Sequence, residues 1–394
     1  MMKRFLKAAA IVLSCVVTLS SFGVGITANA VEYDGQSAAE DVTVEYERYG
    51  DYLYSICDGY AVLEEYVGEG GDIVLPDTIG DYAVREIPYS FLSLFSKWHS
   101  AYEKITSVTI GKNMEMICDR PFSVCTSLRS INVHPENEYY CSVDGVLFNK
   151  TKTKLIEYPP EKSGVSYKVP DSVVEIGKGA FSYCERLTDI EMSDTVTEWG
   201  ESVFYRTGLQ SIKVPKGITV IPADAFAFCT AMKSVVFHSG VTRISYNAFY
   251  QCVGLTVLDL PNGIECIASQ AFYHCENVGI MAIPSSVRTI EDDAFLGCNN
   301  LANVYYMGST EEWNNIEIGE SNDSLSDAIL HCNFLKGDLT RDGRITAIDA
   351  FKIQRGLAGL VTLNGGHKLA ADVNYDGNYN AADCIEILRY AAGM

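Results

Sequence analysis

Two twelve-residue segments near the C-terminus carry oxygen-bearing side chains at the spacing that a hard metal ion requires. They run from Asp338 to Asp349 and from Asp372 to Asp383. Asp, Asn or Thr stands at positions 1, 3, 5, 9 and 12 of each segment, and glycine stands at position 6, where such a loop turns sharply. The pattern therefore predicts two calcium ions, one in each loop. The predicted ligands are the side chains of Asp338, Thr340, Asp342, Asp349, Asp372, Asn374, Asp376 and Asp383 and the main-chain carbonyls of Arg344 and Asn378.

The two loops differ at position 3. Thr340 offers a single hydroxyl in the first loop, whereas Asn374 offers an amide carbonyl in the second. An amide carbonyl is the better calcium ligand of the two. We therefore expect the first loop to bind calcium more weakly than the second.

Each loop runs into a segment with helical periodicity, at residues 350–358 and 384–392. Both loops close with Asp rather than Glu, and Gln354-Arg355 and Leu388-Arg389 follow at matching offsets. With these residues, the segment 333–394 resembles a type I dockerin, a duplicated calcium-binding module that attaches secreted proteins to the cohesin domains of a cellulosome scaffold. The resemblance implies a cohesin partner and two related binding faces. The implied cohesin-binding residues are Ala347, Ile348, Gln354 and Arg355 on one face, and Ala381, Ala382, Leu388 and Arg389 on the other.

A repeat fills the middle of the chain. Phenylalanines recur every 22 or 23 residues, and a fixed period in this range is the signature of a solenoid. They are Phe181, Phe204, Phe226, Phe249, Phe272 and Phe295. The repeat closely resembles the BspA-like bacterial leucine-rich repeats, of the form Ala-Phe-x-x-Cys-x-x-Leu-x-x-Ile-x-Ile-Pro.

That resemblance implies a fold of the α+β class: a leucine-rich-repeat solenoid of about eight rungs of parallel strands with β caps, followed by a small all-α module built from two EF-hand-like units. The expected domains are a signal peptide at 1–30, an N-terminal extension and β cap at 31–70, the solenoid at 71–332 and the dockerin at 333–394. Alternating, turn-bounded segments near 136–164 predict a β-hairpin inserted into the stack.

The repeat strands should turn alternate residues outward. The outward positions of the later repeats are more apolar than those of the earlier ones and form a possible ligand face for a protein or a glycan. This repeat face consists of Val236, Val257, Asp259, Ile280, Ala282, Asn303 and Tyr305. The alternative is that these residues merely suit any strand, or that the C-terminal module covers them.

Twelve cysteines follow residue 30, and six of them stand three residues after a phenylalanine, either of the regular repeat or of an earlier, less regular unit at Phe122. They are Cys125, Cys184, Cys229, Cys252, Cys275 and Cys298. This register favours a column of reduced thiols in the core, although disulfides between neighbouring rungs stay open.

The first 30 residues are typical of a secretory signal peptide. Lys3, Arg4 and Lys7 precede an apolar run, and Ala28-Asn29-Ala30 forms a small-residue cleavage site. The protein is thus expected outside the cell, on a cell-surface or free cellulosome, and no later segment is apolar enough to span a membrane. A formal charge of -21 disfavours nucleic acid as a partner, because nucleic acid is bound through clustered Lys and Arg. A monomer is expected before docking.

A search for catalytic motifs finds none: the sequence has no HExxH, no GxSxG, no Walker loop and no dinucleotide fingerprint. The main hypothesis is therefore a non-catalytic cellulosome component that supports polysaccharide breakdown. The alternatives are a cryptic polysaccharide-degrading enzyme with glycoside hydrolase activity, since acidic residues are plentiful, and a cell-surface adhesin, since BspA-like repeats often occur in adhesins.

Overall fold

The computed structural model describes residues 13–20, 23–30, 42–89, 91–92, 99–122 and 124–394. The chain divides into two compact units, one formed by Met1–Cys125 and Val133–Tyr139 and the other by Thr126–Asn132 and Tyr140–Met394. Among the described residues, no helix is long and apolar enough to cross a membrane.

The first unit is built mainly on one sheet. Antiparallel strands follow one another along it and lead to parallel strands at its end. The order is β1 (Leu13–Ser20), β2 (Gly23–Ala30), β3 (Val42–Tyr49), β4 (Tyr52–Cys57), β5 (Tyr60–Tyr66), β8 (Tyr82–Ile87) and β10 (Met116–Ile117), with β7 (Thr78–Ile79) beside β8. Strand β6 (Gly71–Val74) pairs in parallel with β9 (Ile105–Ile110), and α1 (His99–Tyr102) precedes β9. Buried aromatic side chains, among them Tyr66, Phe91 and Tyr102, fill the core.

The predicted signal peptide falls on the start of this unit. Residues 1–12 and 21–22 lie outside the described residues, and the rest of the segment forms β1 and β2. A fold does not test whether a segment is cleaved on export, so the signal peptide stays a prediction.

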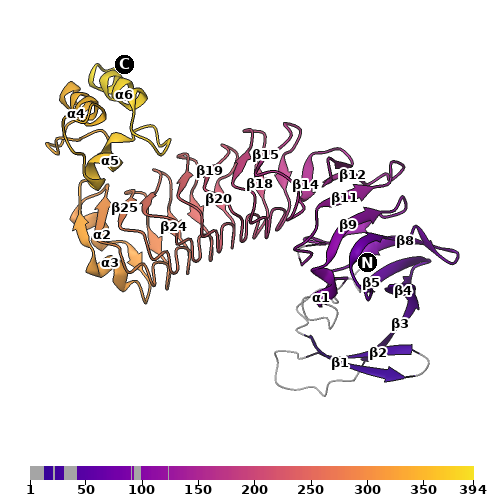
Figure 1. The fold of residues 1–394 in the computed structure, drawn as a ribbon. Coiled ribbons are helices and arrows are strands. Elements are labelled where there is room, and N and C mark those ends of the chain that lie inside the picture. Colours follow the sequence, from indigo (N-terminus) through magenta and orange to yellow (C-terminus); the bar gives the residue numbers. More distant parts are fainter. Residues whose placement is uncertain (1–12, 21–22, 31–41, 90, 93–98, 123) are drawn as a thin grey trace. The chain divides into compact units, whose positions relative to one another are not determined.

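The second unit is a stack of short strands, which Figure 1 shows one behind another from magenta to orange. It begins with the hairpin of β12 (Tyr140–Val143) and β13 (Val146–Asn149), which lies within the segment predicted as an insertion. Two rows of parallel strands then run along the stack. One row consists of β14 (Lys154–Glu157), β16 (Glu175–Ile176), β18 (Glu198–Trp199), β20 (Val220–Ile221), β22 (Arg243–Ile244), β24 (Cys266–Ile267), β26 (Thr289–Ile290) and β28 (Glu317–Ile318).

The other row carries the outward residues of the predicted repeat face. It consists of β15 (Ser166–Lys168), β17 (Asp189–Glu191), β19 (Ser211–Lys213), β21 (Ser234–Val236), β23 (Val257–Asp259), β25 (Ile280–Ile283), β27 (Asn303–Tyr306) and β29 (Ile329–His331). The register is regular, because Val257 pairs with Ile280 and Ile280 pairs with Asn303. Strand β11 (Ser130–Val133) contains the point where the chain returns to the first unit.

Stacked phenylalanine rings form the centre of this unit. From Phe181 to Phe295, the ring centroids of successive repeat phenylalanines lie 5.1 to 5.6 Å apart, and all six side chains are fully buried. The turn around each ring needs left-handed backbone: Asn247 and Gln251, two residues before and after Phe249, have φ of 56° and 55°. Each repeat of 22 or 23 residues in the sequence therefore forms one rung of the stack.

Helices close the chain. The short helices α2 (Thr310–Asn314) and α3 (Asp323–Asp327) follow the last regular repeat. The C-terminal module, residues 333–394, contains α4 (Ala347–Leu357), α5 (Gly365–Ala371) and α6 (Ala381–Ala391) around its own small core, which includes Ile353 and Ile387. A parallel strand stack followed by a small helical module confirms the predicted fold class.

The helices of the module differ in detail from the prediction. Both α4 and α6 begin three residues earlier than expected, because Thr346 and Asn380 cap them from inside the loops. The helix α5 was not predicted. Its seven residues, GGHKLAA, are too few for a helical period to be recognised in the sequence.

Candidate metal centres and docking helices

The first carboxylate of each loop binds the loop's own main chain. Asp338 accepts N–H bonds from Asp342 (3.2 Å) and Gly343 (2.8 Å). Asp372 accepts the equivalent bonds from Asp376 (3.1 Å) and Gly377 (3.0 Å). The two loops thus have the same local geometry.

The last carboxylate of each loop ties the loop to its helix. Asp349 accepts N–H bonds from Thr340 (2.9 Å) and from the helix cap Thr346 (2.8 Å). Asp383 accepts the corresponding bonds from Asn374 (3.4 Å) and from the helix cap Asn380 (2.8 Å), and a further one from Val373 (3.0 Å). Each Asp completes a capping box, and its short side chain reaches both the cap and the loop from the first turn of the helix.

The donor set suits calcium. In each loop the side chains at positions 1 and 12 are buried carboxylates, namely Asp338, Asp349, Asp372 and Asp383. Positions 3 and 5 add a hydroxyl or amide oxygen and a further carboxylate, and hard cations prefer such all-oxygen sets. Among the described residues, no group of three or more His, Cys, Asp or Glu side chains is drawn together into a metal cluster.

The electrostatics of the second loop favour a nearby cation. Burial raises the pKa of Asp372 to about 6, against the opposing effect of the Lys336 ammonium. In the first loop, burial of Asp349 is outweighed by the N–H bonds from Thr346 and Thr340, which hold the pKa of this carboxyl below its usual range. A bound cation would relieve the desolvation cost at Asp372.

The structure exposes all eight residues that the sequence predicts for cohesin binding. Ala347, Ile348, Gln354 and Arg355 lie on the outside of α4, and Ala381, Ala382, Leu388 and Arg389 lie on the outside of α6. Two of these exposed side chains are large and apolar: Ile348 is 64% exposed and Leu388 is 41% exposed.

Sequence reasoning missed further exposed apolar residues on the same helices. Phe351, Ile385 and Tyr390 are 57%, 51% and 66% exposed. Two of them, Phe351 and Ile385, fit the apolar period of the helices, which alone would favour their burial. In a module this small, only one narrow side of each helix can be buried, and Ile353 and Ile387 occupy it.

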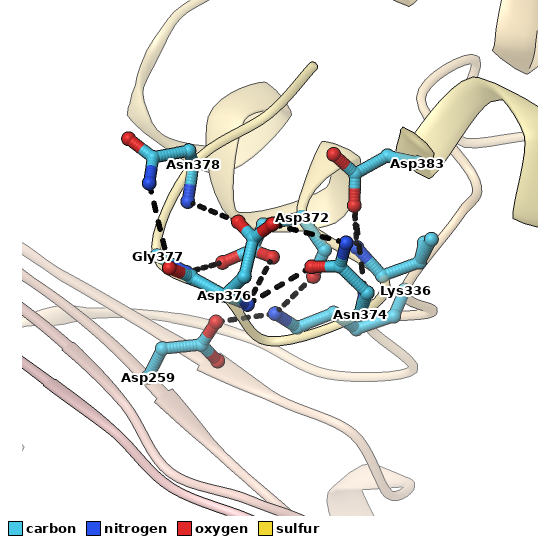
Figure 2. A network of polar contacts seen from close by, with 9 residues as sticks. Asp259, Lys336, Asp372, Asn374, Asp376, Gly377, Asn378 and Asp383 are labelled. Carbon is cyan, nitrogen blue, oxygen red and sulfur yellow. Dashed lines mark hydrogen bonds and ion pairs between the residues drawn. The ribbon is translucent and has the colours of Figure 1, made fainter. Parts of the chain in front are cut away.

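The C-terminal module covers part of the predicted repeat face. Ala282 and Tyr305 are buried against Leu369 of α5, with Ile280 partly buried beside them. Asp259 forms an ion pair with Lys336, which Figure 2 shows beside the second loop. Val257 stays exposed, and Val236 and Asn303 are partly exposed. The C-terminal module thus covers the middle of the repeat face, which is one of the interpretations left open by the sequence.

Comparison with known families agrees with this architecture. The model of the BspA type leucine rich repeat region matches residues 94–232, 161–277 and 200–317, which together make up more than half of the chain. The model of the dockerin type I domain matches residues 336–390. The chain belongs to the BspA-type leucine-rich-repeat family and carries a type I dockerin. Neither matched model describes a catalytic domain.

Solved structures that are similar to this chain include leucine-rich repeat proteins from bacteria. A leucine-rich repeat protein from Eubacterium ventriosum is 25% identical with a TM-score of 0.53, and the match covers 66% of this chain and 64% of that one. The chain therefore spans less than two thirds of that protein's length. A leucine rich cell surface protein from Faecalibacterium prausnitzii is 21% identical with a TM-score of 0.41, covering 69% of this chain and 97% of that one. No curated protein matches the chain.

A polar hollow in the described part of the repeat domain holds two carboxylates that are both paired with cations. It lies beside the β12–β13 hairpin and is lined by polar side chains, including Asp144 and Glu161. Asp144 is ion-paired with Lys162 and Glu161 with Arg186. Glycoside hydrolysis needs one free carboxylate and one protonated carboxyl across the sugar, and these two groups are instead neutralised by cations.

Proposed function

We propose that this protein is an exported, non-catalytic cellulosome component whose dockerin binds a scaffold cohesin in a calcium-dependent way while the repeat domain presents a surface to a protein or glycan. One observation carries the proposal. The two halves of the dockerin expose the same set of helix positions, including large apolar side chains, although both halves pack around one shared core.

Calcium would organise these helices from the loops. Asp338, Thr340, Asp342 and Asp349 would hold one ion together with the carbonyl of Arg344. Asp372, Asn374, Asp376 and Asp383 would hold a second with the carbonyl of Asn378. Because Asp349 and Asp383 also cap α4 and α6, a filled loop would fix the start of the helix that presents Ile348 or Ala382.

The exposed residues define the chemistry of the partner. A cohesin surface that fits them needs an apolar patch for Ile348 or Leu388 and acceptor groups for Arg355 or Arg389, which lie in the last turns of their helices. The small residues Ala347, Ala381 and Ala382 allow close approach at the helix starts.

The test is binding of the full chain to a panel of cohesins, measured by titration calorimetry with calcium and with excess EDTA. We expect binding to a subset of cohesins in calcium and none in EDTA. Binding to no cohesin, or equal binding in EDTA, would contradict the proposal. Release of reducing sugar from polysaccharide by the purified protein would instead favour the enzyme alternative.

A further inference from the structure

The dockerin is packed onto the repeat stack through an apolar contact. Leu369 of α5 is buried against Ala282 and Tyr305 of the repeat face. The approach is close because α5 begins with glycine: a Cβ atom on Gly365 would lie 1.9 Å from Cδ1 of Ile280. A larger residue at Gly365 would therefore push the two surfaces apart.

Lys336 joins the repeat stack to the second calcium loop. Its ammonium is ion-paired with Asp259 of β23, donates a hydrogen bond to the main-chain carbonyl of Asp372 (2.8 Å) and lies 4.1 Å from the ring centroid of Tyr375 (Figure 2). The side chain of Lys336 is only 10% exposed and that of Asp259 only 19%. Asp372 and Tyr375 are positions 1 and 4 of the second loop, so one buried cation contacts both the loop and the repeat.

This arrangement is specific to the second loop. Lys336 precedes the first loop by two residues in sequence, yet it reaches the second, and the equivalent position before Asp372 is Ala370. The first loop contacts the repeat domain through Arg341, whose guanidinium lies 5.5 Å from the Tyr305 ring centroid. Within the described residues, no ion pair joins a carboxylate of the repeat domain to the first loop.

The charges at the contact are unbalanced without a further cation. The Lys336 ammonium pairs with the Asp259 carboxylate but contacts Asp372 only through its main-chain carbonyl, so within the described residues the buried Asp372 carboxylate has no ion-pair partner, and the Oδ1 atom of Asp259 is buried with no hydrogen-bond partner. Buried charge that is not compensated is costly. A divalent cation in the second loop would offset the surplus negative charge where the dockerin meets the repeat stack.

We propose that calcium binding in the second loop and docking of the dockerin on the repeat face stabilise each other, with Asp259 and Lys336 as the positioning residues. The inference rests on the proposed calcium function of the loop. Because coupling between two binding events is reciprocal, a repeat face that holds the dockerin raises the calcium affinity of the loop, and loss of calcium releases the dockerin. Release would uncover Ala282 and Tyr305, so the covered part of the repeat face would be available to a ligand only when the second loop is empty.

The two loops can be told apart by terbium luminescence on the full chain. Terbium replaces calcium in oxygen sites and is sensitised by nearby tyrosine. The second loop contains Tyr375 and Tyr379, whereas the first contains no aromatic residue. An Asp376→Ala variant identifies the part of the emission that comes from the second loop.

Two variants test the coupling by different physical routes. Asp259→Asn leaves Lys336 uncompensated beside the loop, and Gly365→Leu separates the surfaces without changing any charge while placing a better helix former in α5. We expect each to weaken terbium binding at the second loop by about tenfold, within the usual range of coupling between sites. The double variant Asp259→Asn/Lys336→Met removes both charges, so its affinity should return to within about threefold of the parent.

The matched controls make the same kinds of substitution at positions away from the contact between the dockerin and the repeat stack. Glu191→Gln alters the same strand position on β17, where Glu191 is ion-paired with Lys168 at 2.6 Å in an exposed site. Ala358→Leu places the same side chain at an exposed position after α4. Both controls should bind terbium as the parent does.

Hydroxyl-radical footprinting supplies the second readout. Tyr305 is 6% exposed and should be protected in calcium and labelled faster in EDTA, whereas Tyr246, 48% exposed, should be labelled equally in both. Parent-like terbium affinity in both Asp259→Asn and Gly365→Leu, or equally fast labelling of Tyr305 with and without calcium, would overturn the coupling. Absence of any emission from the second loop in the parent would instead overturn the calcium function itself.

Discussion

The Sγ atom of Cys252 lies 3.1 Å from the main-chain carbonyl oxygen of Phe226, which belongs to the preceding rung. The same contact recurs from Cys275 to Phe249 at 3.1 Å and from Cys298 to Phe272 at 3.3 Å. Each thiol therefore donates a weak hydrogen bond to the rung before it. A cysteine fills the small space beside the stacked rings and adds a second hydrogen bond to a carbonyl that already accepts a main-chain N–H bond, as Phe226 does from Cys229.

The first prediction concerns the reactivity of this column. Burial raises the pKa of Cys229 to about 11 and that of Cys298 to about 12, and it raises the pKa values of Cys252 and Cys275 well above the ordinary thiol range. Since the thiolate is the reactive form, native protein at pH 8 should not label at these four positions, whereas unfolded protein should label fully. Mass spectrometry after maleimide treatment measures this. Exposed Cys57 is the internal control and should label in both states.

The second prediction concerns the ring column. Phe249→Ala should lower the free energy of unfolding by about 3 to 5 kcal/mol, because it opens a large cavity between two stacked rings, whereas Cys252→Ala should cost only about 1 kcal/mol. Tyr246→Ala removes an exposed aromatic side chain from the same rung and should change stability by less than about 0.5 kcal/mol. Denaturant unfolding followed by circular dichroism gives all three values. A Phe249→Ala protein as stable as the parent would contradict the assigned register.

Much of the fold can be predicted from the sequence because the core residues of the repeat recur at a fixed period. The spacing of Phe226, Phe249 and Phe272 alone predicts which rings stack. The single 22-residue interval, from Phe204 to Phe226, also has a local cause. Thr207 takes the place of the cysteine, and its hydroxyl lies 3.3 Å from Sγ of Cys229. Local patterns of this kind need no knowledge of distant contacts.

Contacts between distant segments could not be predicted. Lys336 and Asp259 are 77 residues apart, and each taken alone is an ordinary surface-type residue. The burial of Tyr305 under Leu369 depends on how the dockerin is placed on the stack. The repeat pattern of the sequence does not determine this placement. The sequence therefore supports the ligand loops and the docking helices residue by residue, but the partial covering of the repeat face emerges only from the structure.

The third prediction concerns the metal dependence of the helices. Four buried carboxylates, Asp338, Asp349, Asp372 and Asp383, should destabilise the dockerin when no cation offsets their charge. Excess EDTA should therefore remove the helical circular dichroism of α4 and α6 from the full chain, and calcium should restore it. Glu386→Gln, an exposed change on α6 outside the loops, should leave this response unaltered. Helical signal that persists in EDTA would show that the ligand assignment is wrong.

The fourth prediction concerns the difference between the loops. The Thr340 hydroxyl is engaged with Asp338 Oδ1 at 3.1 Å and offers a poorer ligand than the Asn374 amide oxygen. Thr340→Asn should strengthen calcium binding at the first loop several-fold, and Asn374→Thr should weaken the second loop by a similar factor. Calcium titration by calorimetry resolves the two steps. If both substitutions changed calcium affinity in the same direction, the residue at position 3 would not explain the difference between the loops.

The last prediction concerns the two docking helices. Ile348 on α4 and Leu388 on α6 are both exposed, so either helix can lead a cohesin contact. Replacing one face, with Ile348→Asp and Arg355→Glu, should reduce cohesin affinity only about twofold, because the other face remains available and only the number of binding orientations falls. Replacing Leu388 and Arg389 by Asp and Glu should have the same modest effect, and combining the two sets should abolish binding, since apolar contacts at the centre of an interface contribute most of its affinity. Lys368→Gln, an exposed change on α5 outside both faces, serves as the control. If either single set alone eliminates binding, the dockerin uses one orientation, and the duplicated face then serves a purpose other than docking.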